Sequence, residues 1–369
     1  MPDTLHGRKI KVCLVAISLG RGGAERSTAL LSKMLVTKGY DVSLIILNDW
    51  VAYEYAGTLY NLGRNKKQRD SVLKRWQRFA EMRRIIKKEK FDVIIDNRTR
   101  VQGMKEWLYL KWPYRNQKLV YVVRSFNLDQ YFPQNNRVAT KMVQRASAIV
   151  GVSKAIAAKV NSRFATSKAI SIYNPMEELA VTDSNRDFRE RYILFLGRIE
   201  ESVKNFSLLL ASYKASVLLE ANIRLKIVGE GPDSEWLQEQ IKKMGLQDHV
   251  SMLPFTPEVG QYLKNALYLT LTSRYEGFPR VLIEALSMGT PVVSVDCDSG
   301  PNEIIQHEKN GLLVPNHDEK ALTTAMNRMA TDEAFRKECA SYAKKSIEHL
   351  QQEHISKLWD QLIQEIITN

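Results

Sequence analysis

Two glutamates stand eight residues apart where an expected strand ends and an expected helix begins. Residues 272–294 read TSRYEGFPRVLIEALSMGTPVVS, with Glu276 on a loop and Glu284 inside a helix that starts near Arg280. A carboxylate accepts two hydroxyl hydrogen bonds at once, which suits a sugar or a ribose. The amino end of the helix presents N–H groups that suit an anion such as a diphosphate. The helix dipole alone would also favour two exposed acids near a helix start, so the surrounding residues decide between these explanations.

The segment as a whole resembles the signature of retaining glycosyltransferases with two Rossmann-like domains, the group 1 or family 4 set of the GT-B fold. Glu276 and Glu284 match the Glu-x7-Glu motif of that family, and EGFP, EAL and PVV surround them as they do there. The resemblance implies that Glu276 holds the transferred sugar and that Glu284 holds the ribose of the donor. The neighbouring positions assigned to donor binding are Gly277, Phe278, Pro279, Arg280, Val281 and Leu282.

Two cations follow an earlier strand. Gly197-Arg198 comes after residues 192–196, and Lys204-Asn205 opens the next expected helix, which resembles the GR…KN element of the same family. The resemblance implies that Arg198 and Lys204 neutralise the donor diphosphate. Breaking a sugar–phosphate bond leaves negative charge on the departing group, and fixed cations stabilise that transition state. The nucleobase position common in the family corresponds to Leu253, Pro254 and Phe255.

A glycine-rich loop joins the first expected strand to the first expected helix, where residues 18–26 read SLGRGGAER. Glycines there let the backbone approach a ligand closely. Such a loop also occurs in dinucleotide-binding proteins, so it leaves that alternative open. The GGAER form resembles the subgroup of these glycosyltransferases that builds bacterial glycans on lipid carriers. The resemblance implies that Gly22 and Gly23 face the donor phosphate and that Arg21 lies toward the acceptor.

No histidine stands between residues 7 and 248, although many family members place one near the reacting sugar. The corresponding stretch, 122–127, reads VVRSFN, and Arg124 and Asn127 are our candidates for the missing contact, on the acceptor side. Without an imidazole base, a His-driven inverting mechanism is disfavoured. The pattern fits a retaining, front-face reaction in which the leaving phosphate takes the proton of the acceptor.

We expect neither a metal nor another cofactor, because the donor is itself a substrate. Asp296-Cys297-Asp298 is an Asp-x-Asp, the metal motif of a different glycosyltransferase fold, but it follows a strand of the second half. Arg198 and Lys204 already supply positive charge, so we interpret the motif as a coincidence. The three scattered cysteines lack metal-ligand spacing and indicate reduced thiols.

Expected strands alternate with helices along the whole chain, which predicts parallel sheets covered on both faces. The expected strands are residues 10–17, 42–47, 91–95, 119–123, 148–152, 192–196, 223–228, 249–253, 267–272, 291–295 and 311–314. The fold class is therefore α/β, with two doubly wound Rossmann-like domains facing an interdomain cleft. The resemblance implies that this is the GT-B fold. Residues 1–174 would form the acceptor-binding domain, 175–191 a linker and 192–348 the nucleotide-sugar-binding domain. Residues 349–369 would form a C-terminal helix that packs back across the seam, with an apolar face made by His354, Leu358, Leu362 and Ile366.

The positive charge is concentrated in the first half of the chain. Residues 1–175 hold 33 Lys and Arg against 12 Asp and Glu, a net charge of +21, while the whole chain has +13. Residues 64–90 alone hold 12 basic and 3 acidic residues, with apolar residues at helical spacing. Docking on an anionic membrane is the favoured explanation. Nucleic-acid binding or a solvated helix packed on its own domain are the alternatives, and no zinc-finger or RNP-like motif supports nucleic acid.

The sequence therefore predicts a hexosyltransferase that is retaining and metal-independent, moving sugar from a nucleoside diphosphate, with UDP favoured. The acceptor would be a glycan, for example one linked to polyprenyl diphosphate. No apolar run approaches the roughly 18 residues of a membrane span, so we expect a cytoplasmic protein, peripheral on the inner face of the membrane. The alternative from another class is a dinucleotide- or nucleic-acid-binding protein without transferase activity.

Overall fold

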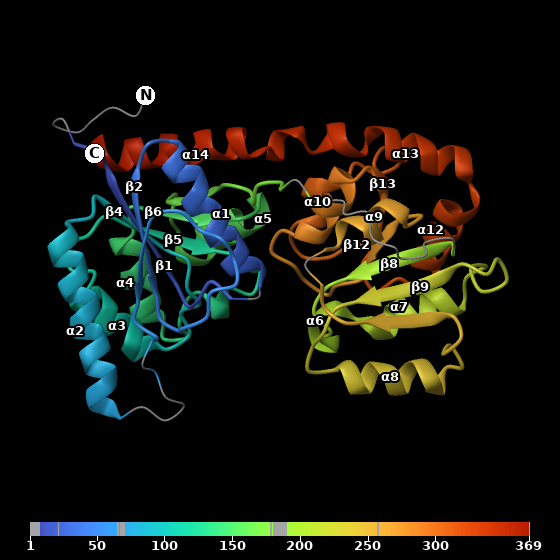
Figure 1. Ribbon diagram of the computed structural model, residues 1–369, viewed down its shortest axis with the longest axis horizontal. Coiled ribbons are helices and arrows are strands. Elements are labelled where there is room, and N and C mark those ends of the chain that lie inside the picture. Colours follow the sequence, from blue (N-terminus) through green and yellow to red (C-terminus); the bar gives the residue numbers. More distant parts are fainter. Residues whose placement is uncertain are drawn as a thin grey trace. The chain divides into compact units, whose positions relative to one another are not determined.

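The computed structural model describes residues 8–20, 22–64, 66, 71–177, 179, 190–256 and 258–368. The chain divides into two compact units, Met1–Pro175 with Gln352–Asn369, and Met176–Gln351. Each unit holds a parallel β-sheet with helices packed around it (Figure 1). The predicted α/β class with two doubly wound domains is confirmed.

The first unit is centred on a seven-stranded sheet. Its strands are β1 (Lys11–Ala16), β2 (Asp41–Ile46), β3 (Thr58–Asn61), β4 (Val93–Asp96), β5 (Leu119–Val123), β6 (Ala148–Gly151) and β7 (Ala169–Ser171). Their order in the sheet is β3-β2-β1-β4-β5-β6-β7, and every neighbouring pair is parallel. Its helices are α1 (Gly23–Thr37), α2 (Val72–Glu89), α3 (Gly103–Lys111), η1 (Leu128–Gln130), α4 (Asn136–Arg145), α5 (Lys154–Phe164) and α14 (Gln352–Thr368).

Helices cover both faces of this sheet. Since α1 leads from β1 toward one edge and α3 leads from β4 toward the other, right-handed crossovers put them on opposite faces. The C-terminal helix α14 packs on α1, and α3 packs on α4. Every residue of β5 is buried, as expected for a strand covered on both sides. The helices cover the two faces of the sheet, so the carboxyl ends of the strands and the loops that follow them are left uncovered by these helices.

The second unit is centred on a six-stranded sheet. Its strands are β8 (Tyr192–Leu196), β9 (Arg224–Val228), β10 (Val250–Leu253), β11 (Leu269–Leu271), β12 (Val292–Asp296) and β13 (Gly311–Pro315). Their order is β10-β9-β8-β11-β12-β13, again with parallel pairs throughout. Its helices are α6 (Glu201–Lys204), α7 (Phe206–Lys214), α8 (Ser234–Lys243), α9 (Gly260–Asn265), α10 (Arg280–Ser287), α11 (Pro301–Ile304), α12 (Glu319–Thr331), α13 (Glu333–Ser346) and η2 (Glu348–Leu350).

The structure differs from the sequence-based assignment at the sheet edge and in the last helix. Strands β3 and β7 were not predicted; both lie at the edges of the first sheet and are short and only partly buried. In α14 the predicted apolar face was His354, Leu358, Leu362 and Ile366, of which Leu362 and Ile366 are buried and His354 is exposed. The buried face also includes Ile355 and Trp359, which stand one position further along the helix than His354 and Leu358.

None of the helices within the described part of the chain is both long enough and apolar enough to cross a bilayer.

Candidate functional site

The candidate site of the second unit lies where its strand order reverses. The chain runs from β8 outward to β9 and β10, then returns to place β11 on the other side of β8. In open parallel sheets, ligands bind beyond the carboxyl ends of the strands at such a switch point. The loops after β8 and β11 carry Lys204 and Glu276, so the topology alone brings these two residues to neighbouring positions.

Lys204 and Glu276 form a close ion pair at this switch point. Nζ of Lys204 lies 2.6 Å from Oε1 of Glu276, and both side chains are largely buried, at 16% and 14% exposure. The hydroxyl of Ser273 donates to the same oxygen at 2.7 Å. The carboxylate is therefore fixed by two donors on one oxygen, which orients it for hydrogen bonds from a ligand. Sequence reasoning missed Ser273, although it stands two residues after β11.

Lys204 is held by the end of β11. Thr272 Oγ1 donates to the carbonyl of Lys204 at 2.8 Å, and Arg274 N donates to Val203 O at 2.8 Å. The Arg274 guanidinium also binds Glu201 Oε1 at 2.9 Å. Lys204-Asn205 was predicted to open a helix, and Asn205 is the N-cap of α7. Lys204 itself is the last residue of the one-turn helix α6, and the backbone turns at Asn205 (φ 55°) between the two helices.

The loop that carries Glu276 is hydrogen-bonded to the loop that follows β12. Glu276 N donates to Asp298 O at 3.0 Å, and Ser299 Oγ donates to Gly277 O at 2.7 Å. A Cβ on Gly300, whose φ is +102°, would lie 2.4 Å from Pro279 Cδ, so only glycine allows this approach. The Asp-x-Asp segment thus contributes backbone contacts to the loop. Burial, with Asp298 beside it, raises the pKa of the Asp296 carboxyl.

Glu284 lies in α10 and is only 8% exposed. Arg280, one helical turn earlier, has its guanidinium 3.8 Å from Glu284 Oε1 and forms a closer ion pair with Glu177. Glu276 and Glu284 are both largely buried, and both face cations. They are therefore not two solvated acids that stand near a helix start only because the helix dipole favours them there. Buried charges are retained when they are paired, and here the pairing groups are themselves suited to a ligand.

The remaining donor-side candidates differ in accessibility. Arg198 is 68% exposed and pairs with Glu200 at 3.3 Å, so its long side chain can turn toward a ligand. Phe278 and Leu282 are buried in the unit, which leaves their backbone rather than their side chains for ligand contact. The other positions are Gly277 and Pro279, which are buried; Val281 and Leu253, which are partly exposed; and Pro254 and Phe255, which are exposed.

The first unit holds the donor-binding candidates Gly22 and Gly23 and the acceptor-side candidates Arg21, Arg124 and Asn127. Gly22 caps α1 and Gly23 is its first residue, while Arg21 lies outside the described residues. Arg124, after β5, donates to Asn174 Oδ1 at 2.8 Å and to Asn97 Oδ1 at 2.9 Å. Asn127 is exposed and caps η1 through its side chain. The guanidinium of Arg124 is thus joined to segments after β4 and β7.

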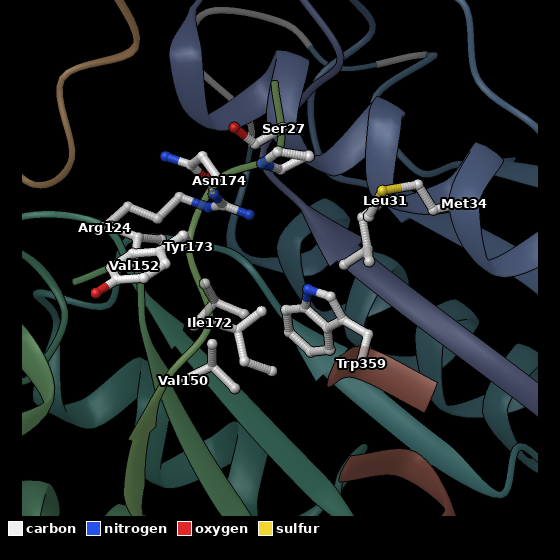
Figure 2. A pocket seen from close by; sticks show the side chains of 12 residues that line it. Ser27, Leu31, Met34, Arg124, Val150, Val152, Ile172, Tyr173, Asn174 and Trp359 are labelled. Carbon is white, nitrogen blue, oxygen red and sulfur yellow. Dashed lines mark hydrogen bonds between the residues drawn. The ribbon is translucent and has the colours of Figure 1, made fainter. Parts of the chain in front are cut away.

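A small pocket adjoins Arg124, lined by α1, β5, β6, the segment after β7, and α14 (Figure 2). Ser27, Arg124 and Asn174 form its polar end, and Leu31 and Trp359 lie at its apolar end. Its volume is about 10 Å³, which is room for one water molecule at most. The pocket therefore belongs to the packing that supports Arg124, and it is too small for a sugar.

A buried charge cluster at the end of β4 was not predicted. Arg98 binds Asp96 at 2.7 Å and Glu106 at 3.0 Å, and Arg100 lies 3.6 Å from Asp96, with all four side chains buried. Burial tends to raise the pKa of Asp96, but the two guanidinium groups outweigh it and hold that pKa below its usual value. Burial raises the pKa of Glu106. The cluster holds the segment after β4 that carries Asn97. In the sequence, the charged residues Asp96 and Arg98 at the end of a strand were the signal for this cluster.

Two doubly wound parallel sheets, with a cation–carboxylate pair at the switch point of the second, define a glycosyltransferase of the GT-B type. The family models agree: "Glycosyltransferase Family 4" matches residues 21–177, and "Glycosyl transferases group 1" matches residues 178–346. The chain belongs to these group 1, family 4 glycosyltransferases. The predicted family and fold are thus confirmed, and the alternative of a binding protein from another class is set aside.

Relatives and solved structures extend over most of the chain. A Campylobacter jejuni N-acetylgalactosamine-N,N'-diacetylbacillosaminyl-diphospho-undecaprenol 4-alpha-N-acetylgalactosaminyltransferase is 27% identical, over 90% of this chain and 94% of its own. The amylovoran biosynthesis glycosyltransferase AmsD of Erwinia amylovora is 25% identical, over 96% and 99%. HepE of Anabaena, solved with UDP and glucose, has a TM-score of 0.78 at 19% identity, over 96% and 100%. This last likeness establishes the fold.

Proposed function

We propose that the protein transfers a hexose, with retention at the anomeric carbon, from a UDP-sugar to a growing glycan carried on a polyprenyl diphosphate. The pairing of Lys204 and Glu276 at the switch point is the observation that carries this proposal. The names of two relatives support it: one acts on a diphospho-undecaprenol-linked glycan and one serves exopolysaccharide synthesis. UDP and glucose in HepE support the choice of donor.

The geometry suits a front-face substitution. The bond from C1 to the β-phosphate oxygen breaks with its electron pair left on that oxygen, where the Lys204 ammonium and Arg198 guanidinium stabilise the charge. The acceptor hydroxyl oxygen bonds to C1 on the same face, and its proton passes to a departing phosphate oxygen. Glu276, fixed by Ser273, accepts hydroxyl hydrogen bonds of the sugar, and Glu284 those of the ribose. The two cations do the work that a metal does elsewhere, so we propose that no metal is needed.

A thermal-shift screen against nucleotide sugars tests the function. Because a ligand that binds only the folded state stabilises it by RT ln(1 + [L]/Kd), a UDP-sugar at a hundredfold excess over Kd should raise Tm by about 5 °C or more. The stabilising donor should then be hydrolysed slowly, at the same rate in excess EDTA. NAD is the control. If no nucleotide sugar shifts Tm or is hydrolysed, the proposed function fails; if EDTA stops hydrolysis, only metal independence fails.

We infer that the first unit docks on an anionic membrane through the α2–α3 surface, which consists of Val72, Leu73, Trp76, Met104 and Trp107. These five side chains are exposed on two helices joined by a ring contact, with Phe79 of α2 and Tyr109 of α3 4.7 Å apart at their centroids. Helix α2 carries seven Lys and Arg against two Glu. Exposed Trp beside clustered cations suits the headgroup region of anionic bilayers, where a lipid-linked acceptor would be reached.

Reversing two charges on α2 tests this docking. Each Lys or Arg near an anionic surface adds about 1 kcal/mol of attraction, so K74E with R75E should weaken binding to vesicles containing phosphatidylglycerol by at least about tenfold. The matched control is K242E with K243E, an exposed pair on α8, which should bind as the wild type does. Co-sedimentation measures both. Equal losses in the two variants, or no binding by the wild type, would exclude docking through this surface.

A further inference from the structure

The loop after β2, residues 47–53, is joined to the glycine-rich loop after β1 by backbone hydrogen bonds. Leu19 N donates to Trp50 O at 2.9 Å, and Ala52 N donates back to Leu19 O at 2.8 Å. Asn48 N donates to Ile17 O at 2.7 Å. The loops that follow the neighbouring strands β1 and β2 are thus hydrogen-bonded together and form one continuous surface at the carboxyl ends of these strands.

Trp50 lies on this surface with its indole against Gly20. A Cβ on Gly20 would be 2.4 Å from Cδ2, 2.6 Å from Cε3 and 2.9 Å from Cε2 of Trp50. These three atoms surround the ring fusion, so one face of the indole lies directly on the glycine backbone. The residue is nevertheless 51% exposed. With one face covered and half of the area accessible, the opposite face of the ring is turned to solvent.

The polar neighbours of Trp50 suit hydroxyl groups. Asp49 is exposed, and its Oδ1 accepts from Asn61 Nδ2 at 2.6 Å, which orients the carboxylate. A Cβ on Gly63 would lie 2.3 Å from Asp49 N, so the backbone of Gly63 packs closely against the backbone of Asp49. A rigid aromatic face beside an oriented carboxylate is preorganised for a ligand that has both apolar C–H groups and hydroxyls.

We propose that Trp50 and Asp49 form a subsite for one pyranose ring of the acceptor glycan. The face of the indole is the negative pole of its quadrupole and attracts the C–H groups on one side of a sugar ring, while Asp49 accepts hydroxyl hydrogen bonds at the rim. The subsite belongs to the first unit, whereas Lys204, Glu276 and Glu284 belong to the second. This inference rests on the proposed function, because it names a part of the substrate of that reaction.

A membrane anchor is the competing role for an exposed Trp, and the local charge disfavours it. Asp49 adjoins Trp50 and is exposed, whereas cations surround the α2–α3 surface. An anionic bilayer repels acidic neighbours. A sugar, in contrast, gains hydrogen bonds from them.

Saturation-transfer NMR tests the subsite with a panel of methyl pyranosides of galactose, glucose, N-acetylgalactosamine and N-acetylglucosamine. We expect the wild type to saturate the C–H protons on one ring face of at least one of them. W50A should reduce that signal by about tenfold, and W50F, which keeps an aromatic face, should largely retain it. G20A should also reduce the signal, because the added methyl group displaces the indole. Y342A, which removes an exposed aromatic side chain from α13, is the control and should leave the signal unchanged.

Two further readings separate this inference from the proposed function. The donor-induced shift in Tm should be the same in W50A as in the wild type, since Lys204, Glu276 and Glu284 lie in the other unit. An unchanged glycoside signal in W50A, or none in the wild type, overturns the subsite while donor binding still supports the transferase. If W50A loses vesicle binding but keeps the glycoside signal, Trp50 is a membrane contact, and the proposed subsite is overturned as well.

Discussion

Replacing Glu276 by glutamine is expected to lower the rate of sugar transfer on the order of 100- to 1,000-fold while leaving UDP bound at least as tightly. The amide keeps the shape of the carboxylate but loses the charge that faces Nζ of Lys204 at 2.6 Å. The ammonium then has no carboxylate competing with the diphosphate for it. Removal of a negative charge beside the site of a dianion also lessens repulsion. The measurements are turnover at saturating donor and the Kd of UDP by calorimetry.

The control for Glu276→Gln is Glu338→Gln, which neutralises an exposed acid on α13 in the same unit. It should leave both turnover and UDP affinity as they are in the wild type. Turnover near the wild-type level in Glu276→Gln would remove Glu276 from the reaction. A folded variant that has lost UDP binding together with turnover would instead assign the carboxylate to nucleotide binding.

The sequence was sufficient for the fold because most strands are buried on both faces and read as uninterrupted apolar runs. Strands β5 and β8 were predicted with their observed bounds. Strands β3 and β7 were missed because edge strands are short and partly exposed, which leaves little apolar pattern to detect. The apolar face of α14 was predicted correctly at Leu362 and Ile366 but not at its start, because Ile355 and Trp359 are the residues buried there against elements far away in the sequence.

The candidate site was predictable where it depends on residues close to the ends of strands. Lys204 and Glu276 are 72 residues apart, yet each follows a strand, and the neighbouring positions of β8 and β11 bring them together. Ser273 was missed because its role depends on the direction of one hydroxyl within a loop. The charge cluster around Arg98 was missed because a run of charged residues in a sequence is more often solvated than buried.

Arg98 is the residue whose loss should destabilise the first unit most. Its guanidinium lies between Asp96 and Glu106, and the ring of Tyr109 stands 3.8 Å from its Cζ. Replacement by methionine keeps much of the volume but leaves one buried carboxylate without its partner, which costs about 3–5 kcal/mol. Five of the six tryptophans lie in the first unit. Tryptophan fluorescence during urea denaturation therefore reports mainly on the unit that contains Arg98.

The loss should also depend on pH, with a sign that identifies its cause. Burial already raises the pKa of Glu106, and removal of Arg98 raises it further because the nearest cation is gone. The folded state then binds a proton that the unfolded state releases, so stability falls as pH rises from about 4.3 through the raised pKa of Glu106. Arg98→Met should therefore lose more stability at pH 8 than at pH 5.5. Arg84→Met, which removes an exposed guanidinium from α2, should change little at either pH, and an equal, pH-independent loss in both variants would mean that the buried charges do not hold the first unit together.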